Sequence, residues 1–201
     1  MPFIDTDLFS MLEASVNNIE ADSPYRLNEI LKEFDYGYLK NGTPCFGPDF
    51  KDYKTISPYA FEKYRIGTSF DYVSFEYEFF KKEFVFDKLN IHTYFIQEYD
   101  GYINPSHAWL TYEFNDYVNI FEAAWKDHKG IFEYDSRSDM FKDYIKKFIN
   151  NNGSDILTAK YVVLEYKPLN VYGLTYNEYL KYIYSNSKII TNTGVNLLEF
   201  I

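Results

Sequence analysis

Apolar residues in the first half of the chain recur with the 3.6-residue period of helices that pack one face on a core. This period predicts helices over residues 6–21, from the Ser23-Pro24 cap onwards, and from Ser57-Pro58 onwards. A further helix runs from Ser69 to about Phe84, with aromatic residues gathered on one face. Residues 42–56 lack this period, and we expect them to form a long loop.

The second half of the chain is dominated by the aromatic and β-branched runs of strands. We expect strands at residues 92–97, 107–114, 117–125 and 157–166, and helices at residues 135–149 and 175–184. Asn115-Asp116 is a two-residue turn that makes a hairpin of the strands on either side. The last fifteen or so residues are expected to form a short strand or a docked tail. Helices followed by an antiparallel sheet give an α+β fold.

Composition places the chain among ordinary globular proteins, because apolar residues make up 46% and charged residues 25% of the 201 positions. Neither a repeat nor a linker divides it, so we expect one domain over residues 1–201. A net charge of −10 disfavours nucleic acid and anionic membranes as partners. The chain has no apolar run of spanning length, no signal-peptide pattern and a single cysteine, and these features predict a cytoplasmic protein without a disulfide.

Ser69 is the first candidate for chemistry, because it follows Gly67-Thr68 and opens a predicted helix. A serine at a helix start usually acts as a cap that accepts a backbone N–H bond. The same place suits a nucleophile, since the helix dipole and its free N–H groups stabilise an oxyanion. The functional interpretation therefore needs acid–base partners near Ser69.

His107 is the second candidate, because it begins a strand directly after a Pro-Ser turn. Strand alternation places it on the face of Trp109, Thr111 and Glu113. A histidine on a half-buried strand more often has a structural hydrogen bond than a catalytic role. At the end of a sheet, however, the ring can be presented to a site.

Glu122 is the third candidate, because it lies in the apolar strand that follows the Asn115-Asp116 turn. Residues that face each other across this hairpin have numbers that sum to about 231, which brings Glu122 diagonally opposite His107. An unpaired buried carboxylate is costly, so a partner is required. Such a contact would fix the imidazole tautomer, as the third member of a triad does. The alternative is a glutamate on the solvent face of an edge strand.

The order of these residues resembles the transglutaminase-like superfamily, in particular small bacterial proteins with G-x-C-x-D, H-T-Y-F-I, a histidine strand, F-E-x-x-W and G-I in sequence. The matching segments are Gly67-Thr68-Ser69-Phe70-Asp71, His92-Thr93-Tyr94-Phe95-Ile96, Ser106-His107-Ala108-Trp109, Phe121-Glu122-Ala123-Ala124-Trp125 and Gly130-Ile131. The resemblance implies a papain-like core with N-terminal helices packed on an antiparallel sheet. That core covers about residues 36–166, and a C-terminal helix and tail cover 167–201.

The resemblance also implies acyl transfer from a peptide or carboxamide substrate without a cofactor. Position 69 would attack the carbonyl, His107 would transfer the proton, and Glu122 would orient the ring. The acyl group would pass to water in a protease or deamidase, or to an amine in a crosslinking enzyme. A protein or peptide is therefore the expected partner.

Ser69 departs from the family pattern, which has cysteine at this position. Three explanations remain: an engineered substitution, a natural pseudoenzyme, or a natural serine enzyme. The third is least favoured, because a hydroxyl is a far weaker nucleophile than a thiol near neutral pH. We therefore expect little or no activity from the Ser69 form. The rival hypothesis is a non-catalytic module that binds a peptide or protein in the same groove, and a weaker one is a phage or toxin-associated effector.

The remaining polar residues suggest structural roles. Cys45 lies in the expected loop, without the surroundings of a nucleophile, and Asp71 complements the helix dipole. His92 is expected to be a hydrogen-bonded strand residue and His128 a solvated one. Three scattered histidines and one cysteine lack metal-ligand spacing, so no metal is predicted.

Overall fold

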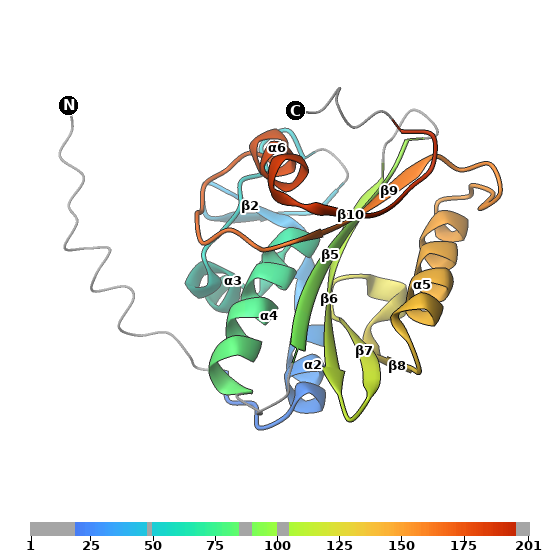
Figure 1. Cartoon of the computed structure of the whole chain (residues 1–201). Helices are drawn as coiled ribbons and strands as arrows, with labels where there is room; N and C mark the ends of the chain where they lie inside the picture. Colours follow the sequence, from blue (N-terminus) through green and yellow to red (C-terminus); the bar gives the residue numbers. More distant parts are fainter. Residues whose placement is uncertain (1–18, 48–49, 85–89, 100–104, 196–201) are drawn as a thin grey trace.

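A six-stranded antiparallel sheet forms the centre of the molecule (Figure 1). The computed structural model describes residues 19–47, 50–84, 90–99 and 105–195. The helix expected at 6–21 lies almost entirely outside these residues. The strands in spatial order are β10 (Lys188–Asn192), β9 (Tyr161–Tyr166), β5 (Asn90–Glu98), β6 (Ser106–Phe114), β7 (Tyr117–Glu122) and β8 (Gly130–Tyr134).

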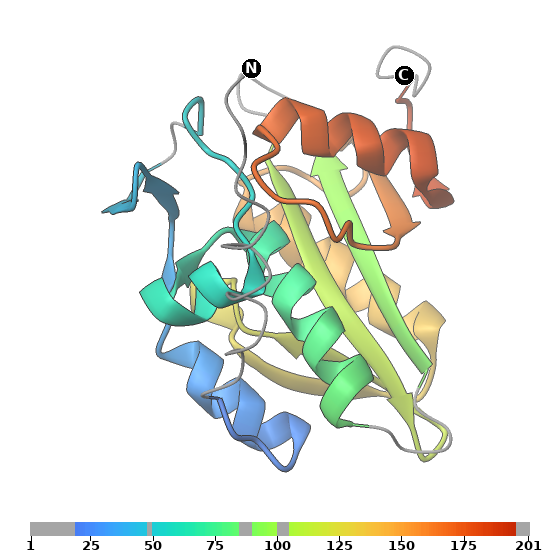
Figure 2. The same cartoon turned by 90° about the vertical axis from the view of Figure 1, so that its left-hand side faces the viewer.

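Helices cover both faces of this sheet (Figures 1 and 2). One face carries four of the five described helices, which are α2 (Pro24–Lys32), α3 (Pro58–Tyr64), α4 (Ser69–Glu83) and α6 (Tyr176–Asn186). The other face carries α5 (Arg137–Asn151). The α+β class and the antiparallel sheet are therefore confirmed, with helices on both faces of it.

Strand alternation decides which helix each sheet residue meets. Leu110 of β6 and Phe121 of β7 are buried against α2, α3 and α4. Their neighbours Trp109 and Ile120 are buried on the opposite face against α5. The alternation expected for the strand at 107–114 is thus confirmed.

The β6–β7 hairpin has the predicted register. Leu110 pairs with Phe121 and Thr111 with Ile120, so that both pairs sum to 231. The turn residues Asn115 and Asp116 both have positive φ, 52° and 69°. Asparagine and aspartate tolerate this left-handed backbone better than most residues, which is why they fit a two-residue hairpin turn.

Several elements differ from the expectation. The long loop at 42–56 is wrong in its first part, because β2 (Tyr38–Lys40) and β3 (Thr43–Cys45) form a hairpin there that includes Cys45. The Asn41-Gly42 turn joins them, and both residues have positive φ. The strand β8 was not predicted, since its half-exposed residues follow a charged turn and do not alternate clearly.

Two of the predicted strands, β7 and β9, are shorter at one end than expected. β7 ends at Glu122 and does not continue to Trp125, because the Glu122 side chain binds the backbone N–H groups that follow it. β9 begins at Tyr161 and not at residue 157, where Leu157 lies in a turn and is 89% exposed. The expected C-terminal strand is present as β10, paired with β9.

A small parallel pair lies beside the main sheet, formed by β1 (Asp35–Tyr36) and β4 (Ile66–Gly67). A Cβ on Gly37 would lie 2.4 Å from the backbone oxygen of Cys45, and one on Gly67 2.7 Å from the Phe61 ring. Glycine is therefore required at both positions for the segments to approach so closely. The pairing of Tyr36 with Gly67 places Tyr36 two residues from Ser69 along the neighbouring segment.

Candidate functional site

Ser69 occupies the first turn of α4, but it is not the capping residue. The N-cap is Thr68, whose backbone N–H and hydroxyl both donate to Asp71 Oδ2, at 2.9 and 3.0 Å. The cap interpretation of Ser69 is therefore wrong, because the residue before it fills that role. Its hydroxyl is left for contacts outside the helix.

Asp71 is a buried hydrogen-bond acceptor that ties this helix start to the preceding segment. Its Oδ1 accepts from the backbone N–H of Ile56 at 3.0 Å and from the hydroxyl of Tyr53 at 3.2 Å. Burial raises the pKa of Asp71 to about 6, and the bonds from Ile56 and Thr68 offset only part of that effect. Asp71 therefore does more than complement the helix dipole, since it also fixes the backbone just before Ser69.

His107 and Glu122 form a buried pair. His107 Nε2 lies 2.7 Å from Glu122 Oε2, and the two residues are 6% and 1% exposed. The diagonal contact expected from the hairpin register is thus confirmed. Because Nε2 is engaged by the carboxylate, Nδ1 is the ring nitrogen that remains to exchange a proton.

Glu122 is held by further donors. Its Oε1 accepts from the backbone N–H groups of Ala124 at 2.8 Å and Trp125 at 2.7 Å, and the Tyr144 hydroxyl donates to Oε2. Burial by itself raises the pKa of Glu122, but the charge of His107 and these hydrogen bonds together hold it below its ordinary value. The carboxylate is therefore the stable form, as an orienting acid requires.

Ser69 contacts the backbone of the residue that follows His107. The Ser69 Oγ accepts from the backbone N–H of Ala108 at 3.3 Å, and Ala108 follows His107 in β6. Among the hydrogen bonds of the described residues, none joins the Ser69 hydroxyl to the His107 ring. The Ser69 hydroxyl thus contacts β6 one residue after His107, and the His107 ring is paired with Glu122.

A cleft of about 530 Å³ opens at Ser69. Its described lining includes the aromatic residues Tyr36, Phe50 and Tyr176 and one cation, Lys51, and it includes no carboxylate. The Tyr176 hydroxyl lies 2.7 Å from Ser106 Oγ, and its ring stacks on Phe50 with the centroids 6.4 Å apart. Helix α6, from the part of the chain outside the family resemblance, therefore supplies one wall of the cleft.

Tyr36 forms another wall, beside Ser69. Burial of its hydroxyl end raises the pKa of Tyr36 to about 12, and the neighbouring Ser69 lowers it only in part. The phenol therefore stays protonated at physiological pH and remains a hydrogen-bond donor at the nucleophile position.

Glu76 is a second buried carboxyl group near the pair. It lies two helical turns after Ser69 in α4, is 1% exposed, and its Oε1 has no hydrogen-bond partner among the described residues. Burial, and then the charge of Glu122, raise the pKa of Glu76 well above its ordinary value. Both effects favour the neutral acid, which reduces the charge repulsion between Glu76 and Glu122.

Sequence reasoning did not identify Tyr36, Tyr144 or Tyr176 as site residues. The chain has 22 tyrosines, so a tyrosine by itself is no signal of a site. Asn28 carried a better signal of a site residue, because it is a polar residue on the apolar face of α2. It is 2% exposed and its Nδ2 donates to the backbone oxygen of Glu122 at 2.9 Å.

The described residues contain no group of three or more histidine, cysteine, aspartate or glutamate side chains placed to hold a metal ion. Within the same part of the chain, no helix combines the length and apolarity needed to cross a membrane. Comparison of the chain with protein-family models, curated proteins and solved structures finds no match. The family resemblance thus depends on the residue pattern of the chain itself.

Proposed function

We propose that this chain has the scaffold of a transglutaminase-like acyl-transfer enzyme of papain-like architecture, with serine at the nucleophile position. The observation that carries the proposal is the buried His107–Glu122 pair, located beside Ser69 at the start of α4. A helix start, an imidazole and a carboxylate are the parts that nucleophilic acyl transfer requires. Here they come from three separate elements.

In the active form, the residue at position 69 attacks a peptide or carboxamide carbonyl. His107 Nδ1 takes the proton from the nucleophile and returns it to the leaving amine. Glu122 holds the ring through Nε2 and stabilises its charged form. The N–H groups at the start of α4 and the Tyr36 hydroxyl are the nearby donors for the oxyanion.

The Ser69 form is expected to have little or no activity. A hydroxyl needs direct contact with a base, and the Ser69 hydroxyl instead accepts from Ala108 N–H. A thiol at the same position would gain more, since a helix start and a nearby imidazolium lower the pKa of cysteine. The geometry supports cysteine chemistry better than serine chemistry.

The cleft supports a peptide or protein as the substrate. Tyr36, Phe50 and Tyr176 offer apolar faces to side chains, and Ser106 and Asn177 offer polar groups to a backbone. The same features support the second hypothesis, a non-catalytic module that binds a peptide in this cleft. The observation that favours this second hypothesis is Ser69 itself.

A Ser69→Cys variant in a Cys45→Ser background tests the proposal. We expect an electrophilic thiol probe to label position 69 rapidly, because His107 and Glu122 increase its thiolate fraction. The matched control is Cys45→Ser alone, which has no thiol and should not be labelled. Adding His107→Asn or Glu122→Gln should slow labelling at neutral pH by about tenfold or more.

If labelling at position 69 were as slow as that of an ordinary exposed thiol and unchanged by His107→Asn, the catalytic assignment would be wrong. Peptide binding by the Ser69 form without labelling of the cysteine variant would instead support the binding module.

A further inference from the structure

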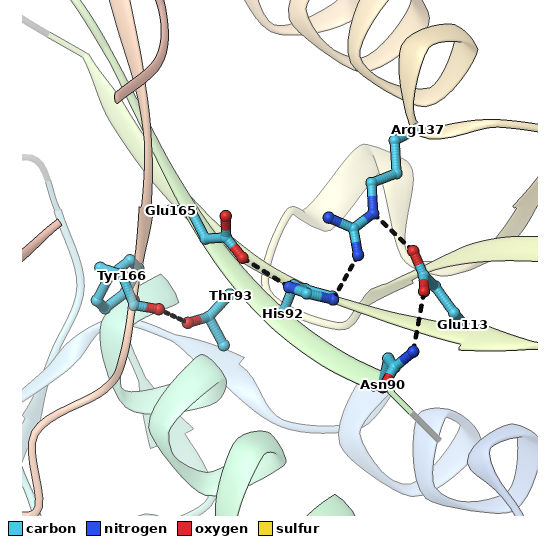
Figure 3. Close-up of polar contacts among 7 residues, drawn as sticks. All are labelled: Asn90, His92, Thr93, Glu113, Arg137, Glu165 and Tyr166. Carbon is cyan, nitrogen blue, oxygen red and sulfur yellow. Dashed lines mark hydrogen bonds and ion pairs between the residues drawn. The ribbon is translucent and has the colours of Figure 1, made fainter. Parts of the chain in front are cut away.

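A second polar network, centred on His92, joins strands of the main sheet to the start of α5 (Figure 3). His92 Nδ1 is 2.6 Å from Glu165 Oε1 of β9, and His92 Nε2 is 2.6 Å from Arg137 Nη2 at the start of α5. Arg137 Nε in turn donates to Glu113 Oε1 of β6 at 2.6 Å. The imidazole ring of β5 thus contacts β9 and α5 directly, and Arg137 extends the network to β6.

The donors and acceptors in this network allow one protonation state of the ring. Every guanidinium nitrogen of Arg137 carries hydrogen and none accepts, so His92 Nε2 must present a lone pair. The Glu165 carboxylate accepts and does not donate, so His92 Nδ1 must carry the proton. The network as observed therefore contains a neutral ring in the Nδ1–H tautomer.

A second proton on His92 is incompatible with this arrangement. It would place two N–H donors and two positive charges 2.6 Å apart, at His92 Nε2 and Arg137 Nη2. Arg137 would leave the ring but keep its bond to Glu113, whose pKa that bond holds below the ordinary value. Glu165 would stay with the ring, since an imidazolium strengthens a bond to a carboxylate.

The other groups around His92 do not replace Arg137 as a donor to Nε2. Tyr94 of β5 stacks its ring on the imidazole, with the centroids 6.2 Å apart. Lys167 and Lys188 line the same hollow of about 420 Å³ as His92 and Glu165, and they add positive charge there.

We propose that His92 is a proton-controlled clamp, in which the neutral ring joins the start of α5 to strands β5 and β9 and a second proton releases Arg137. The clamp acts on the first turn of α5, because Arg137 is its first residue. Two turns further along, Tyr144 of the same helix donates to Glu122. The proposal needs no catalytic activity and is independent of the proposed function.

Ring-nitrogen NMR of the unmodified chain is the first test. The His92 signals are assigned by their loss in His92→Gln. At pH 8 we expect them to show a protonated Nδ1 and an unprotonated Nε2. This is the opposite of the tautomer that a solvated histidine prefers, so a ring that merely packs would not produce it. A His92 ring with its proton on Nε2 at pH 8 would overturn the proposal.

The second test compares Arg137→Gln in two backgrounds. With His92 present, we expect the substitution to lower the folding equilibrium constant about fivefold at pH 8 and less than twofold at pH 5. In the His92→Gln background, Arg137→Gln should change the folding equilibrium constant by the same factor at both pH values. Glutamine also accepts and donates hydrogen bonds, but it does not titrate. An equal effect of Arg137→Gln at both pH values with His92 present would contradict the clamp.

Discussion

Glu122 shows at the scale of a single residue how one buried charge organises the site. It is the last residue of β7, and its oxygens receive bonds from a histidine, a tyrosine and two backbone N–H groups. Such a carboxylate is stable only because every donor is in place, since an unpaired buried charge is strongly destabilising. The same bonds end the strand and orient His107.

Replacing Glu122 by glutamine is therefore expected to destabilise the fold by about 3 kcal/mol at pH 7. The amide keeps the volume but loses the charge, and its NH₂ group would face other donors. Urea unfolding of both proteins, monitored by circular dichroism, measures the difference. A difference below about 0.5 kcal/mol would contradict the buried ion pair.

The pH dependence of this difference has a defined sign. The pKa of Glu122 is lower in the folded than in the unfolded state. Its contribution to the free energy of unfolding is therefore complete when the pH is above the unfolded-state pKa. This contribution is lost as the pH falls through the lower, folded-state pKa. The part of the stability difference between the native protein and Glu122→Gln that comes from the carboxylate charge should therefore be complete at about pH 5 and decrease in more acidic solution.

At the scale of elements, the short parallel pair β1–β4 determines what surrounds Ser69. Each strand has two residues, so the pair contributes few backbone bonds of its own. Its effect is geometric, because the register places Tyr36 against the segment that leads into α4. The close approach is possible only with glycine at positions 37 and 67.

Gly37→Ala is expected to destabilise the protein by about 2 kcal/mol or more, because the added methyl group meets a backbone oxygen that cannot rotate away. Thr43→Ala, on the exposed face of the adjacent β3, is a suitable control and should change stability by less than about 0.5 kcal/mol. Thermal and urea unfolding of the two variants measure these losses in the free energy of unfolding. Equal stability of both variants would show that the segment shifts freely.

At the scale of the whole molecule, the C-terminal segment belongs to the same core as the predicted site. β10 pairs with β9 at one edge of the sheet, and α6 buries Tyr179 and Ile183 against α4 and the sheet. Tyr176 then reaches the cleft from the start of that helix. The described residues at 167–195 therefore shape the site as well as the fold.

Ile183→Ala is expected to lower the free energy of unfolding by about 2–5 kcal/mol, because the side chain is fully buried. Leu157→Ala removes an aliphatic side chain of equal size that is 89% exposed, and should cost less than about 0.5 kcal/mol. Urea unfolding distinguishes the two. A small effect of Ile183→Ala would mean that α6 is a loosely attached appendage.

The sequence predicted those features of the fold that depend on residues close together in the chain. Caps and periodicity located α3, α4 and α6, and the Asn115-Asp116 turn set the hairpin register that joins His107 to Glu122. These features are local, since each depends on residues a few positions apart. The same reasoning failed for β1 and β4, whose pairing joins distant segments, and for β8, whose half-exposed residues do not alternate clearly.

By itself, the amino-acid sequence determined the α+β class, the main helices and the diagonal acid–imidazole contact, because periodicity and a two-residue turn act over short stretches of chain. Only the tertiary structure decided that Tyr144 donates to Glu122, that Tyr36 and Tyr176 line the cleft at Ser69, and that Ser69 accepts from Ala108 N–H. The reason is physical: those residues are brought together by packing across the sheet, and many tyrosines in the sequence have the same local pattern.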